Sequence, residues 1–339
     1  MASQPPVTRL LGQGAPATCT HRVADLLVRV RAFRLPLALR FGWNPRPFLE
    51  AHTMSSTASP LAVPEPWNLV APEYVRELLP VFEHFAKDAL TRVAAPSGAH
   101  VLDVAAGPGT LALLAARQGL RVTAIDFAPK MLAALRERAA SAGLDIDAQV
   151  GDGMALELSE QTFDAAFSLF GLMFFPDRPR GFRELYRVLR PGGRAVISSW
   201  RPMEHSPAMN LVYQRFAEQL PGQGAPRGGV MPLSDPDTCQ QEMGAAGFDD
   251  VRVHQVSVPA HYPSTAAMVD AMMRAAAPVA LARRALGDQW PDIEKTVVDK
   301  VTQDLGPGAQ VVQFNAYLTV GIRQPTPPSN TRHPSTPKG

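Results

Sequence analysis

Three acidic residues and a glycine turn have the types and spacing that could bind a nucleoside. Asp103 stands at the end of an apolar run, Asp126 ends the next apolar run, and Asp152 follows the third. Between the first two, Gly107 and Gly109 form a turn that leads into a helical pattern, and such a turn brings backbone N–H groups close to a ligand. A carboxylate at the position of Asp103 repels a pyrophosphate but suits an ammonium group. The pattern therefore favours a nucleoside with an amino-acid tail.

The roles of the other two acids follow from their places in the chain. Asp126 can accept hydrogen bonds from two ribose hydroxyls, and Asp152 from an exocyclic adenine amine, with Met154 covering the ring. A dinucleotide fits less well, because the third glycine of its fingerprint is replaced in the sequence Gly109-Thr110-Leu111-Ala112. The structural alternatives are a plain tight turn, a helix cap at Asp126 and an ordinary turn at Asp152.

The elements that must position these residues alternate between strand and helix patterns. Strands are expected at His100–Val104, Arg121–Ile125, Asp145–Val150, Ala165–Phe170, Ala195–Ser199, Val251–Val258 and Phe314–Ile322, and helices at Tyr74–Thr91, Thr110–Arg117, Lys130–Ala142 and Arg180–Leu189. This order predicts an α/β fold with a mostly parallel sheet and helices on both faces. Ligands of such sheets bind beyond the carboxyl ends of the strands.

The ordered motifs resemble those of class I S-adenosylmethionine-dependent methyltransferases. They read VLDVAAGPGTLAL, VTAIDFAPKML, GDGMAL, FDAAFSLFGLMFFPD and RVLRPGGRAVISSW, and the likeness spans about residues 67–200. It is greatest to the small-molecule branch that includes ubiquinone- and menaquinone-type methylases. The resemblance implies a Rossmann-like seven-stranded sheet with an antiparallel last strand, and S-adenosylmethionine as cofactor. Ala105 stands where many members have glycine.

The resemblance also implies a role for each matching residue. Asp103 and the turn at 105–109 are expected to hold the methionine part of the cofactor, and Asp126 and Phe127 its ribose and adenine. Residues 152–154 are expected to contact the adenine, and residues 168–170 to face the sulfonium. Tyr74 either closes over the methionine end or is a half-buried core tyrosine. The full expected set is Tyr74, Asp103, Ala105, Gly107, Pro108, Gly109, Asp126, Phe127, Met131, Asp152, Gly153, Met154, Ser168, Leu169 and Phe170.

Methyl transfer from a sulfonium is an in-line displacement, so the protein needs a general base only if the acceptor must lose a proton. His205 follows the fifth predicted strand and is the first candidate for a base; the alternative is an exposed loop histidine. His261 and Tyr262 are weaker candidates. The run 170–175 either lines an apolar acceptor pocket or belongs to the core.

Two segments beyond the cofactor half are expected to supply helical lid and substrate elements. They are residues 207–243 and 263–305, within a substrate region at about 201–310. Met268, Met272 and Met273 in the second segment suit an adaptable pocket or simple packing. We expect a small, hydrophobic or aromatic acceptor.

The two ends of the chain differ in composition from the domain expected at residues 54–323. Residues 1–53 contain seven Arg, no Lys and two acidic residues, so they are either a mitochondrial-type targeting segment or an extension upstream of a start at Met54. The Pro-rich tail at 324–339 is expected to be disordered. Cytoplasmic location is expected, with mitochondrial location as the alternative.

Composition excludes several classes of protein. No apolar run is long enough for a membrane span, and two cysteines alone make no zinc site, so no metal is expected. The chain after residue 53 is mildly acidic and has no Asn/Asp-Pro-Pro-aromatic motif, which argues against a nucleic-acid methyltransferase. A protein methyltransferase and a non-catalytic binding protein with the same fold stay open, and an oxidoreductase has less support.

Overall fold

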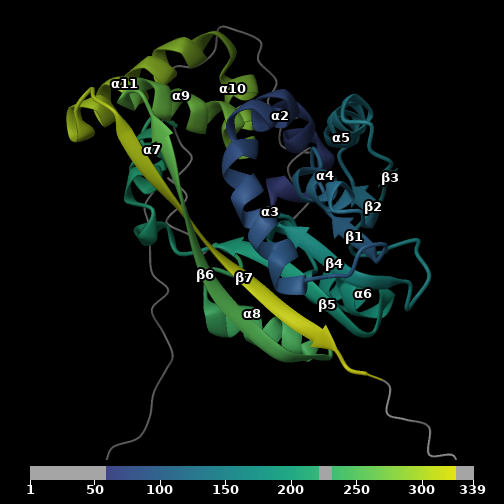
Figure 1. Ribbon diagram of the computed structural model, residues 1–339. Helices are drawn as coiled ribbons and strands as arrows, with labels where there is room; N and C mark the ends of the chain where they lie inside the picture. Colours follow the sequence, from purple (N-terminus) through teal and green to yellow (C-terminus); the bar gives the residue numbers. More distant parts are fainter. Residues whose placement is uncertain (1–58, 221–230, 326–339) are drawn as a thin grey trace, which may run out of the picture. The chain divides into compact units, whose positions relative to one another are not determined.

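The computed structural model describes residues 59–220 and 231–325 of the chain (Figure 1). The predicted extension at 1–53, with Cys19, lies outside the described residues, and so does the predicted tail from residue 326. The strands are β1 His100–Val104, β2 Arg121–Asp126, β3 Asp147–Val150, β4 Phe163–Leu169, β5 Leu189–Trp200, β6 Phe248–Tyr262 and β7 Gln310–Arg323. The α-helices are α2 Pro64–Glu77, α3 Leu79–Val93, α4 Thr110–Arg117, α5 Pro129–Ser141, α6 Arg178–Val188, α7 Pro207–Ala217, α8 Pro236–Ala245, α9 Thr265–Ala275, α10 Ala277–Leu286 and α11 Trp290–Leu305. Four short 3₁₀ helices complete the described elements: η1 Pro60–Ala62, η2 Leu172–Phe174, η3 Met203–His205 and η4 Gly287–Gln289.

The strands of the described residues form one seven-stranded sheet in the order β3-β2-β1-β4-β5-β7-β6. Every pairing from β3 to β5 is parallel, whereas β7 runs antiparallel to both of its neighbours. The predicted fold class is therefore confirmed. The strand order reverses between β1 and β4, and the crevice at such a reversal is where ligands bind in open α/β sheets.

Successive side chains on the central strands point to opposite faces of the sheet, and both faces are buried beneath helices. Val101 and Phe167 pack in one cluster with residues of α3, α4 and α5, while Leu102 and Ala166 pack in another with residues of α6 and α8. All four side chains are fully buried. Strands covered on both faces are typical of parallel sheets, and their rigidity fixes the strand ends that hold the site.

One predicted helix is two helices in the structure. The span Tyr74–Thr91 was expected to be continuous, but α2 ends at Glu77 and α3 begins at Leu79. Pro80 lies in the first turn of α3. Proline is tolerated there, because its missing N–H is not needed, whereas inside a helix its ring clashes with the preceding turn. The break lets α2 turn away from α3 and lie beside α5, α9 and α10 (Figure 1).

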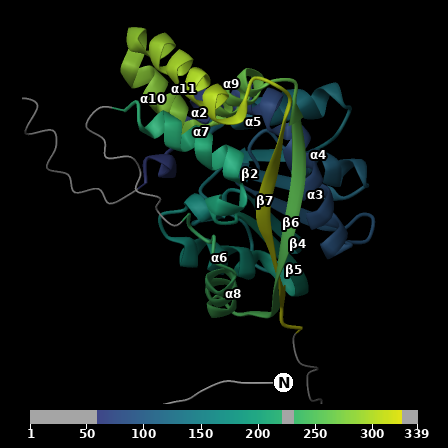
Figure 2. The ribbon, with the colours of Figure 1, turned by 90° about the vertical axis from the view of Figure 1, so that its left-hand side faces the viewer.

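The predicted lid segments contain α7 to α11. Figure 2 shows α9, α10 and α11 gathered with α2 and α7 at one end of the sheet, away from α6 and α8. Met268, Met272 and Met273 on α9 are buried in the main core, so packing accounts for them. In the described ranges no single helix is long and apolar enough to cross a membrane, although the bent pair Thr265–Ala275 and Ala277–Leu305 passes that test together.

Candidate functional site

A cavity of about 250 Å³ lies beyond the carboxyl ends of β1 to β4. Eleven of the fifteen expected cofactor residues line it: Tyr74, Ala105, Gly107, Asp126, Phe127, Met131, Asp152, Gly153, Met154, Leu169 and Phe170. They come from four strand ends and two helices that are distant in the sequence. The parallel sheet thus brings the sequence motifs to one place.

Four expected residues do not line the cavity. Asp103 and Ser168 are buried behind it, at 2% and 0% exposure, and Pro108 and Gly109 are buried in the turn. The Ser168 hydroxyl accepts a hydrogen bond from the Leu172 N–H at 3.1 Å. Ser168 therefore supports the loop after β4, and the structure does not bring it to the place expected for a sulfonium.

Asp126 joins the end of β2 to the glycine turn. Its Oδ2 accepts a hydrogen bond from the Gly107 N–H at 2.7 Å, and its Oδ1 accepts one from the Ala128 N–H at 2.8 Å. Burial raises the pKa of Asp126 to about 6, although backbone N–H groups of Ala128, Gly107 and Phe127 oppose the rise. Each carboxylate oxygen has a further lone pair, so both can still accept a hydroxyl.

Asp103 is a buried carboxyl with an unused oxygen. It lies beneath the first turn of α4, where the nearby Ala112 N–H favours the ionised form, and its Oδ2 has no partner among the described residues. Burial raises the pKa of Asp103 to about 8, with the nearby Asp126 adding to the rise. A cationic group brought close to this oxygen would stabilise the ionised carboxylate and lower its pKa.

The stability of the protein is expected to fall as pH rises from about 4 to 8. The folded-state pKa of Asp103 lies above its ordinary value of 3.8, so in this window the folded protein holds a proton that the unfolded chain has released. The free energy of unfolding then falls by up to about 1.4 kcal/mol per pH unit for this group. Asp126 contributes with the same sign up to about pH 6.

Urea unfolding of the wild type and Asp103→Asn at several pH values measures the Asp103 contribution. Asparagine keeps the shape of the side chain but does not titrate. The wild type should lose stability relative to the variant between pH 4 and 8, and parallel pH profiles would contradict the assignment.

The turn after β1 has a backbone that favours glycine. Ala105, Gly107 and Gly109 all have positive φ values, of 56°, 55° and 79°. A Cβ at Gly107 would meet no atom within 4 Å, whereas one at Gly109 would lie 2.5 Å from Leu135 Cγ. Gly107 thus keeps the cavity open, and Gly109 permits α4 to pack against α5. The positive φ of Ala105 is one that glycine adopts more readily than alanine.

Three residues before Tyr74 also line the cavity and were not expected there. Leu61, Ala62 and Trp67 line it from η1 and α2, and Trp67 Nε1 donates to the Leu61 carbonyl at 2.9 Å. The Asn68 side chain accepts from the Lys130 N–H at 2.9 Å, which ties α2 to the first turn of α5. No motif marks these residues, because their role depends on the bend between α2 and α3.

The apolar run at residues 170–175 was expected either to line a pocket or to belong to the core, and the structure divides it between the two. Phe170, Gly171, Phe174 and Phe175 line the cavity, together with Pro176, whereas Leu172 and Met173 are buried in the core. Gly151 also lines the cavity and was not expected to. An apolar run alone does not show which side chains face a cavity.

The candidate bases lie away from the cavity. His205 is exposed on η3, and His261 is exposed near the end of β6; neither these two nor Tyr262 line the cavity. Tyr74 does line it, but burial and the nearby Asp126 raise the pKa of its hydroxyl far above the usual range. Tyr74 is therefore a hydrogen-bond donor at neutral pH and not a base.

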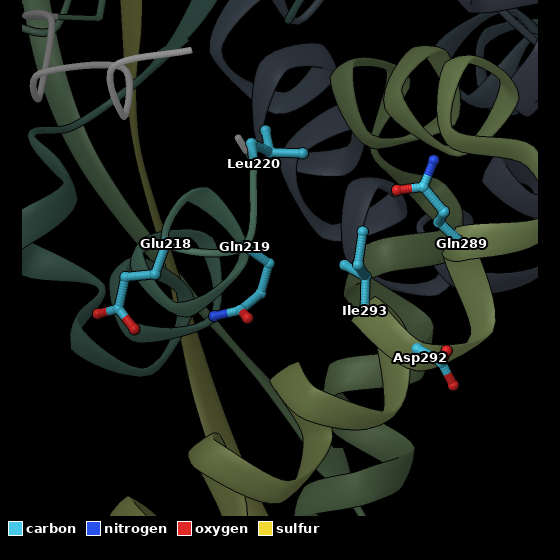
Figure 3. Close-up of a pocket in the computed structure, with 6 residues that line it drawn as sticks. All are labelled: Glu218, Gln219, Leu220, Gln289, Asp292 and Ile293. Atoms are coloured by element: carbon cyan, nitrogen blue, oxygen red, sulfur yellow. The ribbon is translucent and has the colours of Figure 1, made fainter. Parts of the chain in front are cut away.

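A second hollow of about 420 Å³ lies between the end of α7 and the start of α11 (Figure 3). Its lining residues are Glu218, Gln219, Leu220, Gln289, Asp292 and Ile293, none of which was expected at the site. Glu218 is already paired with Arg215 and Lys300. In the described parts of the chain, no group of three or more His, Cys, Asp or Glu side chains is placed to hold a metal. The cavity at the strand ends is therefore the candidate site.

Comparison with known proteins finds similar sequences and structures. Residues 101–193 match the family described as methyltransferase domain. Demethylmenaquinone methyltransferase of Thermus thermophilus is 36% identical over 162 residues, which cover 44% of this chain and 73% of that protein. The enzyme of the same name from Deinococcus radiodurans is 32% identical over 204 residues, covering 55% of this chain and 85% of that protein.

Other relatives and a solved structure extend the likeness. An uncharacterized Mycobacterium tuberculosis protein is 34% identical over 154 residues, 45% of this chain, and the match spans about half of its length, 54%. The crystal structure of the YcgJ protein from Bacillus subtilis superposes with a TM-score of 0.51 at 17% identity, covering 72% of this chain and 99% of that chain. At that identity the structure supports the fold alone.

Proposed function

The chain belongs to the class I S-adenosylmethionine-dependent methyltransferases, and we propose that it transfers a methyl group from S-adenosylmethionine to a small, hydrophobic or aromatic acceptor. The observation that supports this most strongly is the meeting of three strand-end motifs around one cavity. The turn after β1, Asp126 after β2 and Asp152 after β3 all line it.

The residues present fit the cofactor. The unused Oδ2 of buried Asp103 suits the ammonium of an amino-acid tail, and the first turn of α4 beside it suits the carboxylate. Asp126 has lone pairs left for two ribose hydroxyls. Asp152 is exposed at the far end of the cavity, where an adenine amine can donate to it.

When bound, the cofactor supplies a reactive methyl group on its sulfonium. The contribution of this chain is to align the reactants and to exclude water. Trp67 and Leu61 cover the cavity from one side, and Phe170 lines it at the end of β4. The Tyr74 hydroxyl stays protonated and can orient a partner by donating a hydrogen bond.

The lining supports an aromatic acceptor without a negative charge near the reacting atom. Five aromatic side chains line the parts of the cavity near α2 and the loop after β4: Trp67, Tyr74, Phe170, Phe174 and Phe175. No Lys, Arg or His occurs among the described lining residues, so an anionic group in this cavity would have no cationic partner there. The two demethylmenaquinone methyltransferase relatives favour an aromatic ring over a nucleic acid or a protein as acceptor.

Cytoplasmic location is part of the proposal. The relatives described above come from bacteria, which supports it over the mitochondrial alternative. No role as a base is proposed for His205, because the side chain lies outside the cavity lining.

Calorimetric titration of the full chain with S-adenosylmethionine and S-adenosylhomocysteine tests the cofactor assignment. We expect binding in the micromolar range, which corresponds to about 8 kcal/mol. Transfer of labelled methyl groups to a panel of phenols, quinols and amines then tests the acceptor class. Absence of binding would contradict the proposal and favour a non-catalytic binding protein, whereas binding with transfer only to an anionic acceptor would contradict the acceptor class.

A further inference from the structure

The loop after β4 is held by two buried serine hydroxyls. Ser198 Oγ on β5 accepts a hydrogen bond from the Phe170 N–H at 2.8 Å, and Ser168 Oγ accepts one from the Leu172 N–H at 3.1 Å. Both serines are almost fully buried, with exposures of 1% and 0%. A buried N–H needs a partner, so these bonds fix the backbone of the loop.

The backbone of Phe170 lies in a sparsely populated conformation. Its φ of 56° is uncommon for any residue other than glycine and a clear exception for a bulky aromatic one. Such conformations persist only where the surroundings determine them, and they concentrate at ligand sites. The bond to Ser198 is the direct polar constraint on this residue.

The side chain of Phe170 lies between the cavity and an aromatic cluster. Its ring stacks on Trp200 with centroids 4.1 Å apart and on Phe82 with centroids 4.7 Å apart. Two aromatic neighbours thereby hold the ring, and the side chain still lines the cavity. A change in the backbone of Phe170 would therefore alter the shape of the cavity.

The loop also touches the turn that follows β1. A Cβ at Gly171 would lie 2.3 Å from Ala105 Cβ, so the two segments pack as closely as glycine allows. Ala105 lines the same cavity. Movement of the loop after β4 would consequently reach the turn expected to hold the methionine part of the cofactor.

We infer that Ser198 is a positioning residue for the donor site: by holding the Phe170 N–H it fixes the aromatic side of the cofactor cavity. Ser198 and Trp200 are two residues apart on β5 and face the same side of the sheet. One strand thus holds Phe170 twice, its backbone through Ser198 and its ring through Trp200. The inference rests on the proposed function where it concerns the cofactor.

The next serine on the strand provides a matched control. Ser199 is also 1% exposed, and its hydroxyl donates to the Leu233 carbonyl at 2.6 Å on the opposite side of the sheet. Ser198→Ala and Ser199→Ala each remove one buried hydroxyl: the first loses the bond from the Phe170 N–H, and the second loses the bond to the Leu233 carbonyl and the 3.7 Å bond with Cys239 Sγ. They should lower the melting temperature to a similar extent, but only the first should affect Phe170.

The test compares the full-length wild type, Ser198→Ala and Ser199→Ala by calorimetric titration with S-adenosylhomocysteine and by near-ultraviolet circular dichroism. Ser198→Ala should raise the Kd about tenfold and reduce the aromatic dichroism from the Phe170–Trp200 stack. Ser199→Ala should leave both within twofold of the wild type. Ser198→Cys keeps a weaker acceptor of similar size and should give intermediate values; it replaces the alanine variant if that variant does not fold.

Equal effects of the two alanine variants on Kd and dichroism would overturn the inference, and so would an unchanged Kd in Ser198→Ala. If the wild type itself binds no S-adenosylhomocysteine, the proposed function and the effect on affinity both fail. The dichroism of the two variants then still decides whether Ser198 holds Phe170.

Discussion

Replacing Asp126 with alanine is expected to weaken binding of S-adenosylhomocysteine about 100-fold or more. The carboxylate is the proposed acceptor for both ribose hydroxyls, and it also holds the Gly107 N–H at 2.7 Å. Hydrogen bonds to a charged group contribute roughly 1.5–3 kcal/mol each, and about 1.4 kcal/mol corresponds to a factor of ten in affinity. Two such bonds therefore account for the expected loss, and calorimetric titration measures it.

Asp164→Ala is the matched control for this experiment. Asp164 lies at the opposite end of the sheet, near the start of β4, and also accepts a backbone N–H, from His100 at 2.8 Å. Asp164 is more exposed than Asp126 and is also paired with Arg190, and its loss removes a hydrogen-bonded carboxylate without touching the cavity. The control should lose stability but keep its affinity. Equal affinities in the wild type and Asp126→Ala would show that Asp126 is not a ligand.

Binding by Asp126→Ala should also depend less on pH. In the wild type, protonation of a carboxyl with a pKa of about 6 removes an acceptor of the ribose hydroxyls, so affinity should fall as pH drops below 6. The variant lacks this group. Any pH dependence of affinity that remains in the variant comes from other groups, such as Asp103.

The sequence motifs predicted the strand-end residues well because those motifs are local. The sequence from Val101 to Thr110 encodes a strand, a turn and a helix within ten residues, and the structure has all three. The pairing of β1 with β2 and β4 then brings Asp126 and Phe170 to the same edge. The parallel order follows from alternating strands and helices, so this part of the site was predictable.

The site residues that were not predicted depend on contacts between segments that are distant in the sequence. Trp67 lines the cavity because α2 turns away from α3 at Leu78, and the turn is fixed by packing of Val70 and Ala71 against Met131 and Ala277. None of these pairings leaves a periodic signal in the sequence. His205 follows the expected strand, but the 3₁₀ turn there leaves its side chain exposed. The position of a residue after a strand shows at which end of the sheet the residue lies, but it does not show where its side chain points.

Gly109→Ala is expected to destabilise the protein by roughly 2–5 kcal/mol. Its φ of 79° costs an L-residue roughly 1–2 kcal/mol, and overpacking of a core costs typically about 1–3 kcal/mol more. The new methyl group would lie 2.5 Å from Leu135 Cγ and 2.7 Å from Leu113 Cδ1, and neither side chain has room to move, because their exposures are 0% and 3%. Urea unfolding measures the loss.

Gly107→Ala is expected to lower the affinity for the ligand much more than the stability of the fold. Its φ of 55° gives the same backbone cost of roughly 1–2 kcal/mol, but its methyl group would meet no protein atom within 4 Å. Because Gly107 lines the cavity, that open space belongs to the proposed cofactor. Gly107→Ala should therefore fold with a modest loss of stability and bind S-adenosylhomocysteine at least tenfold more weakly. Wild-type affinity in this variant would place the ligand elsewhere, and a loss of stability as large as that of Gly109→Ala would contradict the open space seen beside Gly107.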